Sequence, residues 1–205
     1  MKYILLCFLL LLALAGQSQS STDQKNEISI SYGLATLVDI KESIGTHDEV
    51  MPIDTTSFVG ANDAPLKGAL IFTYRRKVDP RFWVGLASGI GARWGAYVLY
   101  NSYTKERRKA GSYREFYFPI AFETRYAYIH SGAFSMYFLL GLGKDIGVAK
   151  RNYTITALED KKIVYSEFSF QFTPLGLRYG GRYAFFAELG LGYRGILNAG
   201  ISRTF

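Results

Sequence analysis

The chain has 205 residues and a mass of 23.0 kDa, enough for one domain with its own core and too short for two large ones. Aromatic residues make up 16% of it, charged residues 20%, and the formal net charge is +7, a composition that excludes a disordered or collagen-like chain. After the first residues no apolar run approaches the roughly 18 residues that a membrane helix needs, so any membrane span must be built from strands.

The N-terminus has the pattern of a secretory signal peptide. Lys2 precedes an apolar stretch over residues 3–14, and the small and polar run from Ala15 to Ser20 follows. We expect residues 1–19 to be a cleaved signal peptide, with the cut between Ala15 and Ser20, and residues 20–205 to form one barrel domain. An uncleaved anchor is the alternative, but about twelve apolar residues are too few to span a membrane. Cleavage removes Cys7, the single cysteine, so the mature chain has no disulfide.

From Glu27 onward, apolar and polar residues alternate with period 2, which predicts strands and no helix. Between Phe172 and Leu175 the parity switches, which predicts a bulge at Thr173 and Pro174. Three long connections (38–65, 100–112 and 150–163) alternate with tight turns. Long loops at one end and short turns at the other predict an all-β, eight-stranded antiparallel up-and-down transmembrane β-barrel. The expected strands cover residues 28–35, 66–76, 82–98, 114–126, 136–142, 168–179, 183–194 and 197–205.

Side-chain size indicates which face points outward. One parity is rich in Phe, Tyr, Leu and Ile and the other in Gly, Ala and Ser, and the bulky set from eight strands would not fit inside a narrow barrel. The bulky face is therefore expected to meet lipid. A soluble periplasmic lipocalin-like carrier, which would place that face inside, remains the weaker alternative. Four basic residues on the lipid parity are expected near strand ends, namely Arg76, Arg114, Lys144 and Arg203.

Aromatic residues gather at both ends of the expected strands, as two interfacial girdles would require. The first set flanks the short turns and comprises Tyr74, Phe82, Tyr126, Tyr128, Phe134, Tyr179 and Tyr183. The second set lies at the loop ends and comprises Tyr100, Tyr113, Tyr165 and Tyr193.

Eight charged residues share the inward parity, and ions in a narrow interior must be paired or hydrogen-bonded. We expect a salt-bridge network that plugs the barrel, with a narrow gated ion or small-solute channel as the alternative. The set is Lys67, Arg75, Arg93, Glu115, Glu123, Arg125, Glu188 and Arg194.

The last strand, residues 198–205, carries a polar residue at Asn198, a glycine at Gly200 and a terminal aromatic at Phe205. This pattern resembles the C-terminal signal of the small outer-membrane β-barrel proteins of Gram-negative bacteria, and the layout looks closest to the PorT-like outer membrane protein β-barrel domain. Arg203 departs from the family pattern, which usually has an aromatic or apolar residue there. The resemblance implies insertion by the barrel assembly machinery and residence in the cell outer membrane.

Motifs that would indicate an enzyme are weak. The run Gly190-Leu-Gly-Tyr-Arg-Gly195 matches a dinucleotide fingerprint, but no helix and second strand can follow it so near the end. His47 and His130 are expected at opposite ends of the barrel and cannot share a metal. We therefore expect no enzyme activity, no cofactor, no metal and no nucleic-acid partner.

The outer loops are the expected place of function, because loops on rigid scaffolds carry binding sites. Lys105, Arg107, Arg108 and Lys109 lie in one loop and are candidates for contact with lipopolysaccharide phosphates, the alternative being a solvated loop. Residues 38–65 are the likeliest site for an unidentified partner. The sequence thus predicts an integral outer-membrane protein with a structural or interaction role through its extracellular loops.

Overall fold

The computed structural model describes residues 25–40, 51–52, 57–61, 67–101, 103–154 and 158–205. The expected signal peptide, most of loop 38–65 and His47 lie outside these residues. The strands in chain order are β1 (Asn26–Leu34), β2 (Met51–Pro52), β3 (Ser57–Ala61), β4 (Ala69–Asp79), β5 (Phe82–Asn101), β6 (Arg107–Ser131), β7 (Phe134–Tyr153), β8 (Lys161–Gly180), β9 (Tyr183–Gly192) and β10 (Leu197–Thr204).

Eight of these strands close into a ring in which every neighbour is antiparallel. β1 pairs with β4 on one side and with β10 on the other, and the β5–β6 pairing completes the circle. The chain ends meet at the seam, where the backbones of Asn26 and Phe205 exchange two hydrogen bonds of 2.9 Å. The expected eight-stranded up-and-down barrel is confirmed. The sequence did not predict β2 and β3, which extend the sheet beside the outer part of β5.

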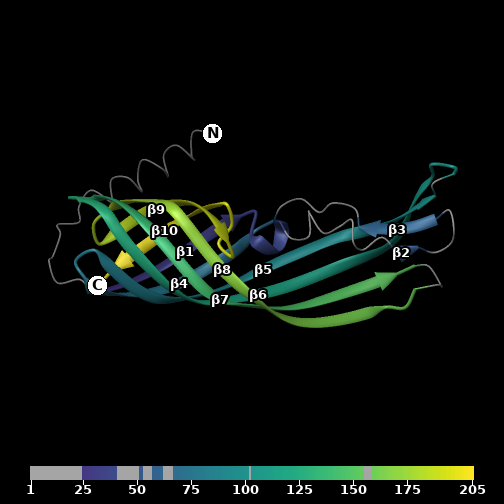
Figure 1. The fold of residues 1–205 in the computed structure, drawn as a ribbon, viewed down its shortest axis with the longest axis horizontal. Coiled ribbons are helices and arrows are strands. Elements are labelled where there is room, and N and C mark those ends of the chain that lie inside the picture. The colour runs from purple at the N-terminus through teal and green to yellow at the C-terminus, as the bar shows by residue number, and fades with distance from the viewer. Residues whose placement is uncertain (1–24, 41–50, 53–56, 62–66, 102, 155–157) are drawn as a thin grey trace, which may run out of the picture.

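Four strands continue far beyond the barrel on the side of the long loops. β5 to β8 have 20 to 25 residues each, against 8 to 11 in β1, β4, β9 and β10. Figure 1 shows the closed barrel at one end and these strands, with β2 and β3, projecting from it as a sheet. The expected loops 100–112 and 150–163 are therefore too long. β5 reaches Asn101 and β6 begins at Arg107, while β7 reaches Tyr153 and β8 begins at Lys161.

The bulge expected in the sixth barrel strand is confirmed. The register between β8 and β9 shifts between Phe172 and Leu175, and Thr173 and Pro174 occupy the irregularity. Proline has no N–H to donate to a ladder, so a bulge is where a paired strand tolerates it.

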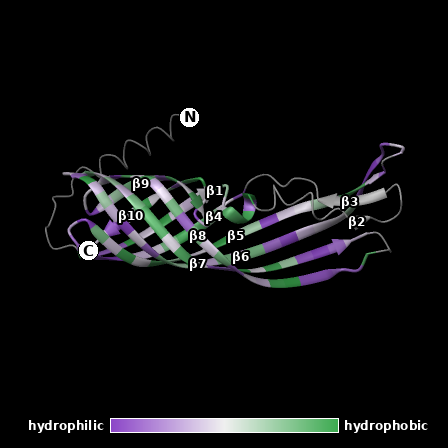
Figure 2. Cartoon of the chain, viewed as in Figure 1, coloured by the Kyte–Doolittle hydropathy of each residue, from purple (hydrophilic) through white to green (hydrophobic). Residues whose placement is uncertain are grey.

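The bulky face points outward and the polar face inward, as the sequence predicts. Ile30, Phe72, Phe122 and Leu140 are exposed, whereas the neighbouring parity is buried and carries most of the charged groups of the strands. In Figure 2 the hydrophobic segments concentrate on the barrel and the hydrophilic ones on the projecting sheet. We call the exposed apolar side chains of the barrel strands the belt. No helix within the described ranges is both long enough and apolar enough to cross a membrane.

Only one of the two expected aromatic girdles forms. The residues beside the short turns are exposed or, for Phe82, half-buried. Of the second set, however, Tyr113 and Tyr193 are buried and Tyr165 points inward, so the girdle at the loop ends is wrong for these three. Their rings lie over inward-facing glycines, whose missing side chains make room for the rings. Gly147 is the cross-strand partner of Tyr165, for example, and a Cβ added to Gly147 would be 2.1 Å from the Tyr165 ring.

One basic residue on the belt lies deeper than expected. The sequence predicts Lys144 near a strand end, but β7 continues to Tyr153, and Lys144 lies between the exposed Leu142 and Ile146. A lysine at such a position keeps its amine near the polar layer only by extending its stem along the strand.

Candidate functional site

The bore of the barrel is filled by ion pairs built around three glutamates. Glu123, on β6, accepts hydrogen bonds from Arg75 Nη2 at 2.7 Å and from Arg194 Nε and Nη2 at 2.6 and 2.9 Å. The Tyr193 hydroxyl donates to the same carboxylate at 2.5 Å. Glu123 and Arg194 are both 0% exposed, so the pair is fully removed from water. Its charges and hydrogen-bonding groups must therefore be satisfied within the protein.

The second glutamate, Glu27 on β1, links three arginines from other strands. Arg75 Nη1 donates to it at 3.1 Å, Arg125 Nη1 at 2.6 Å, and Arg178 Nε lies 3.3 Å from it. Arg75 also contacts Glu123, so the two carboxylates belong to one network. This network crosses the bore from β1 to β6.

The third glutamate, Glu188 on β9, completes the network. Arg194 Nη1 lies 3.3 Å from it, Tyr137 donates its hydroxyl at 2.7 Å, and Asn198 Nδ2 donates at 2.6 Å. We call Glu27, Glu123, Glu188, Arg75, Arg125, Arg178 and Arg194 the plug. Three carboxylates face four guanidinium groups, so the plug carries a formal charge of +1 and is close to neutral.

A second layer closes the bore toward the long loops. After β1 the chain turns at Ala35, whose φ is 56°, into a helical turn over residues 37–40. Asp39 accepts from the backbone N–H of Thr36 at 2.9 Å and of Gly68 at 3.2 Å, and it lies 3.7 Å from Arg93. The Thr36 and Tyr117 hydroxyls are 3.0 Å apart, which ties this turn to the barrel wall.

Arg93 connects that layer to a further carboxylate. Its Nη1 is 3.2 Å from Glu115 and also donates to the Val38 carbonyl at 3.2 Å, and Tyr165 donates to Glu115 at 2.5 Å. The bore is therefore filled by two layers of side chains, the plug and the layer around Asp39 and Arg93, and in each layer the side chains form hydrogen bonds and ion pairs across the bore.

The structure places seven of the eight sequence-predicted lumen charges inside the barrel. Arg194 reaches the bore from the turn after β9, not from a strand. Lys67 is the exception: its Nζ donates to the Trp94 carbonyl at 2.9 Å and lies over the exposed Trp94 ring, so its predicted place in the lumen is wrong. The prediction extended the alternation of β4 back to Lys67, but Gly68, whose φ is 88°, interrupts that alternation. Partial desolvation and, to a smaller extent, the nearby positive charge of Arg93 lower the pKa of Lys67.

Among the described residues, four charged side chains of the interior are not in the predicted set. Arg178 and Asp145 share the inward parity of their strands, and Glu27 lies one residue before the expected start of the first strand, so alternation alone would have found these three. Asp39 follows the strand in a turn, where parity gives no signal.

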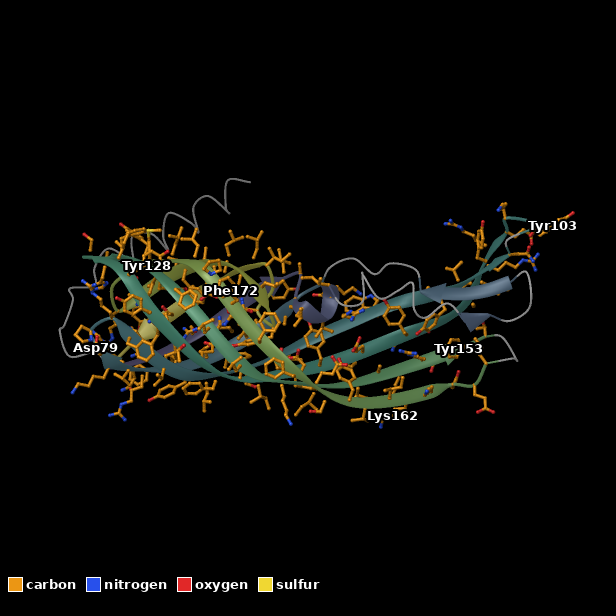
Figure 3. The ribbon with its side chains drawn as sticks, in the orientation of Figure 1. Asp79, Tyr103, Tyr128, Tyr153, Lys162 and Phe172 are labelled. Carbon is orange, nitrogen blue, oxygen red and sulfur yellow. The ribbon has the colours of Figure 1, made fainter. Side chains whose placement is uncertain are left out.

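The projecting sheet has an aromatic cluster on the same side as the bore. Tyr97, Ala110 and Tyr113 are buried there, with Leu99, Tyr153 and Leu158 packed against them. The Tyr97 ring lies 5.6 Å from that of Tyr113 and 5.0 Å from that of Tyr153. This packing explains why the strands stay paired so far from the barrel. In Figure 3, Tyr153 lies near the outer end of the sheet and Tyr103 at its tip.

The predicted lipopolysaccharide residues lie at that tip. Lys105, Arg107, Arg108 and Lys109 are all exposed; Arg108 pairs with Glu106 at 3.1 Å, and Arg107 lies 5.7 Å from the Tyr100 ring. The predicted assembly signal lies in and just after β10. Asn198 is buried against Glu188, the position of Gly200 has no room for a Cβ because Ile30 O would be 2.2 Å away, and Phe205 is exposed.

No cluster of potential metal ligands occurs among the residues whose placement is described, and His130 is exposed at the β6–β7 turn. The Gly190–Gly195 run forms the end of β9 and its turn.

No family model and no curated protein matches the chain. Among solved structures, it is similar to Ail, the attachment invasion locus protein of Yersinia pestis, with a TM-score of 0.42, 14% identity, and coverage of 89% of this chain and 96% of that one. A structure of Ail in complex with the heparin analogue sucrose octasulfate has a TM-score of 0.39, with 14% identity and coverage of 88% and 96%. Likeness at this level carries no functional argument, and the fold rests on the strand register described above.

Proposed function

We propose that the chain is an integral protein of the outer membrane, anchored by its barrel, that presents the projecting sheet outside the cell for structural or binding contacts. One observation carries the proposal: the barrel exposes apolar side chains all round while its charged groups pair inside. In water this arrangement would expose a large continuous apolar surface, whereas in a bilayer it is the stable one.

The height of the belt supports this placement. On β6 the exposed apolar side chains run from Phe116 to Tyr128, twelve steps along the strand that rise about 30 Å when a strand tilts by about 40°. An outer-membrane barrel needs an apolar band of about 25 Å. The short turns and both strand ends of the seam then lie on the periplasmic side, and the long strands project outward.

The interior argues against the channel and the carrier. Conduction would require the arginine and glutamate pairs of the plug to separate in a dry bore, which costs several kcal/mol for each ion left unpaired. A lipocalin-like carrier needs an apolar cavity, yet most of the largest fully buried side chains in this bore are charged or tyrosine groups, and Ile71 and Leu139 are the apolar ones among them. Planar-bilayer recording tests the first point, and sustained open levels would support the channel instead.

Export and assembly complete the proposal. Residues 1–19 would direct secretion and be removed, and Asn198, Gly200 and Phe205 would be read by the barrel assembly machinery, as the resemblance to PorT-like barrel proteins implies. The exposed terminal Phe205, hydrogen-bonded at the seam, is consistent with that role.

Fractionation of cells that express the full chain tests the location. We expect the protein in the outer membrane, migrating faster on a gel when unheated than when boiled. Recovery in the soluble periplasmic extract would contradict the proposal. A pull-down from intact cells, comparing the full chain with one lacking residues 41–66, tests the unidentified partner of the first loop.

A further inference from the structure

A row of basic side chains crosses three strands on the outward face where the projecting sheet leaves the belt. Arg114 on β6 is the direct cross-strand partner of Lys150 on β7, and Lys150 is that of Lys162 on β8. All three are exposed. We call Arg114, Lys150 and Lys162 the cationic row. Figure 3 labels Lys162 on the part of β8 that continues beyond the barrel.

Direct cross-strand partners have Cβ atoms about 5 Å apart, and like charges at such positions destabilise a sheet. Among the described residues, the outward positions of β6, β7 and β8 above the belt carry no Asp or Glu. The inward face shows the contrast, because Glu115 on β6 is paired there with Arg93 on β5. An external anion is what would stabilise three cations in register.

The position of the row identifies that anion. The next outward row toward the barrel is Phe116, Val148 and Val164, again direct partners. Phe116 and Val164 are exposed and belong to the belt, and Val148 between them is half-buried. On the other side of Arg114, its partner Trp94 is 58% exposed, with the Lys67 amine over its ring. Tryptophan at the end of an apolar belt marks the membrane interface.

We propose, on the basis of the proposed function, that the cationic row binds the phosphate groups of lipopolysaccharide in the outer leaflet. Its acyl chains would lie against the Phe116 row while its phosphates accept charge-assisted hydrogen bonds from Arg114, Lys150 and Lys162. Because strands tilt, the row climbs obliquely, and on β8 Val164 and Ser166 lie between Lys162 and Phe168. The three cations therefore lie at slightly different heights, and their long side chains allow them to reach phosphates of the same layer.

The same geometry separates the row from the basic tip. Trp94 and Asn101 are seven residues apart on β5, about 23 Å along the strand. Lys105 lies beyond Asn101, and Arg107 lies opposite Tyr100. Lys109 lies opposite Val98, four residues or about 13 Å beyond Trp94 along the strand. All three are too far for their side chains to reach phosphates at the edge of the belt. The tip therefore serves as a matched control of equal charge.

The test is a titration of the refolded mature protein in detergent micelles with fluorescent lipopolysaccharide. One triple variant carries Arg114→Gln, Lys150→Gln and Lys162→Gln, and the control carries Lys105→Gln, Arg107→Gln and Lys109→Gln. At about fivefold per interfacial cation, the row variant should bind on the order of a hundredfold more weakly. The control should stay within about threefold.

Enzymatically dephosphorylated lipopolysaccharide should bind the unchanged protein as weakly as intact lipopolysaccharide binds the row variant. Equal losses in both variants, no loss in the row variant, or indifference to dephosphorylation would overturn the proposal. So would heparin binding that depends on the row without any lipopolysaccharide binding, which would indicate a soluble polyanion. Heat-modifiable migration of all variants shows that the barrel is intact, so a failure here leaves the proposed location standing.

Discussion

Replacing Glu123 by glutamine should destabilise the barrel strongly, because this carboxylate neutralises two buried arginines. Arg75 donates to it once and Arg194 twice, at 2.6 to 2.9 Å, and Tyr193 donates a fourth hydrogen bond. The amide that replaces it keeps one oxygen, but its NH2 group faces guanidinium donors. The two arginines then lose the charge that compensates them in a bore without water access.

Breaking a buried ion pair by removing one partner costs about 3–5 kcal/mol. We expect Glu123→Gln to lower the free energy of unfolding by about that amount, a large share of the roughly 5–15 kcal/mol typical of a domain. Urea titration of the protein folded in lipid vesicles, followed by the gel shift between folded and unfolded forms, measures it. The matched control is Glu106→Gln, whose partner Arg108 is exposed and whose loss should cost under about 0.5 kcal/mol.

A double-mutant cycle separates the ion pair from a simple packing effect. Much of the cost comes from the arginine left unpaired, so combining Glu123→Gln with Arg194→Gln should cost at least about 1 kcal/mol less than the sum of the two single changes. Strict additivity, or a loss below about 1 kcal/mol for Glu123→Gln alone, would refute the reasoning.

Three further predictions follow from the same structure. Leu140→Arg, at mid-height on the belt, should cost about 2–4 kcal/mol in vesicles, and Phe134→Arg at the turn end about 0–1 kcal/mol, so equal costs would contradict a lipid-facing belt. Gly176→Val should lower the free energy of unfolding by about 1–3 kcal/mol in a urea titration, because an added Cβ would be 2.2 Å from the Tyr137 ring. The control Gly132→Asn should be nearly neutral, and a larger loss for Gly132→Asn than for Gly176→Val would contradict the ring packing. Asp39→Ala should speed amide exchange at Thr36 and Gly68 without changing the unfolding midpoint by much, and unchanged exchange would show that the turn is held by other contacts.

Alternation of residue size predicted the barrel because the two faces of its wall have different surroundings. Along β6 the outward residues at 116, 118, 120 and 122 are exposed and apolar, whereas the intervening residues face a packed interior, so the two parities carry different residue types. The bulge at Pro174 was predictable for the same reason, because a bulge switches the parity of the residues that follow it and proline is tolerated at a bulge.

The projecting sheet was not predictable in this way. Residues 107–112 and 150–153 read as polar loops, because beyond the belt the outward face is wet and charged residues such as Lys109 and Lys150 replace the apolar ones. What keeps these strands paired is the contact of Tyr97 with Tyr113 and Tyr153 from other strands. Such non-local packing leaves no period in the sequence.

The plug was predicted in part, for a similar reason. Parity identified most of its members, including Arg194, but it could not say which arginine meets which glutamate, nor that Arg194 would reach the bore from a turn and not from a strand. The tyrosines at loop ends were assigned to the interface because their cross-strand glycines, such as Gly95 beside Tyr113, are distant in sequence.

The two native tryptophans offer the most direct measurement of side-chain orientation. Trp94 is 58% exposed on the outward face, whereas Trp83 is 9% exposed, with the Arg125 guanidinium 4.9 Å from its ring. In vesicles of brominated lipid, the Trp83→Phe variant, which retains Trp94, should lose most of its fluorescence, and the Trp94→Phe variant, which retains Trp83, should keep most of its own. Strong quenching of Trp83 with little quenching of Trp94 would contradict a barrel whose apolar side chains face lipid and whose charges fill the bore.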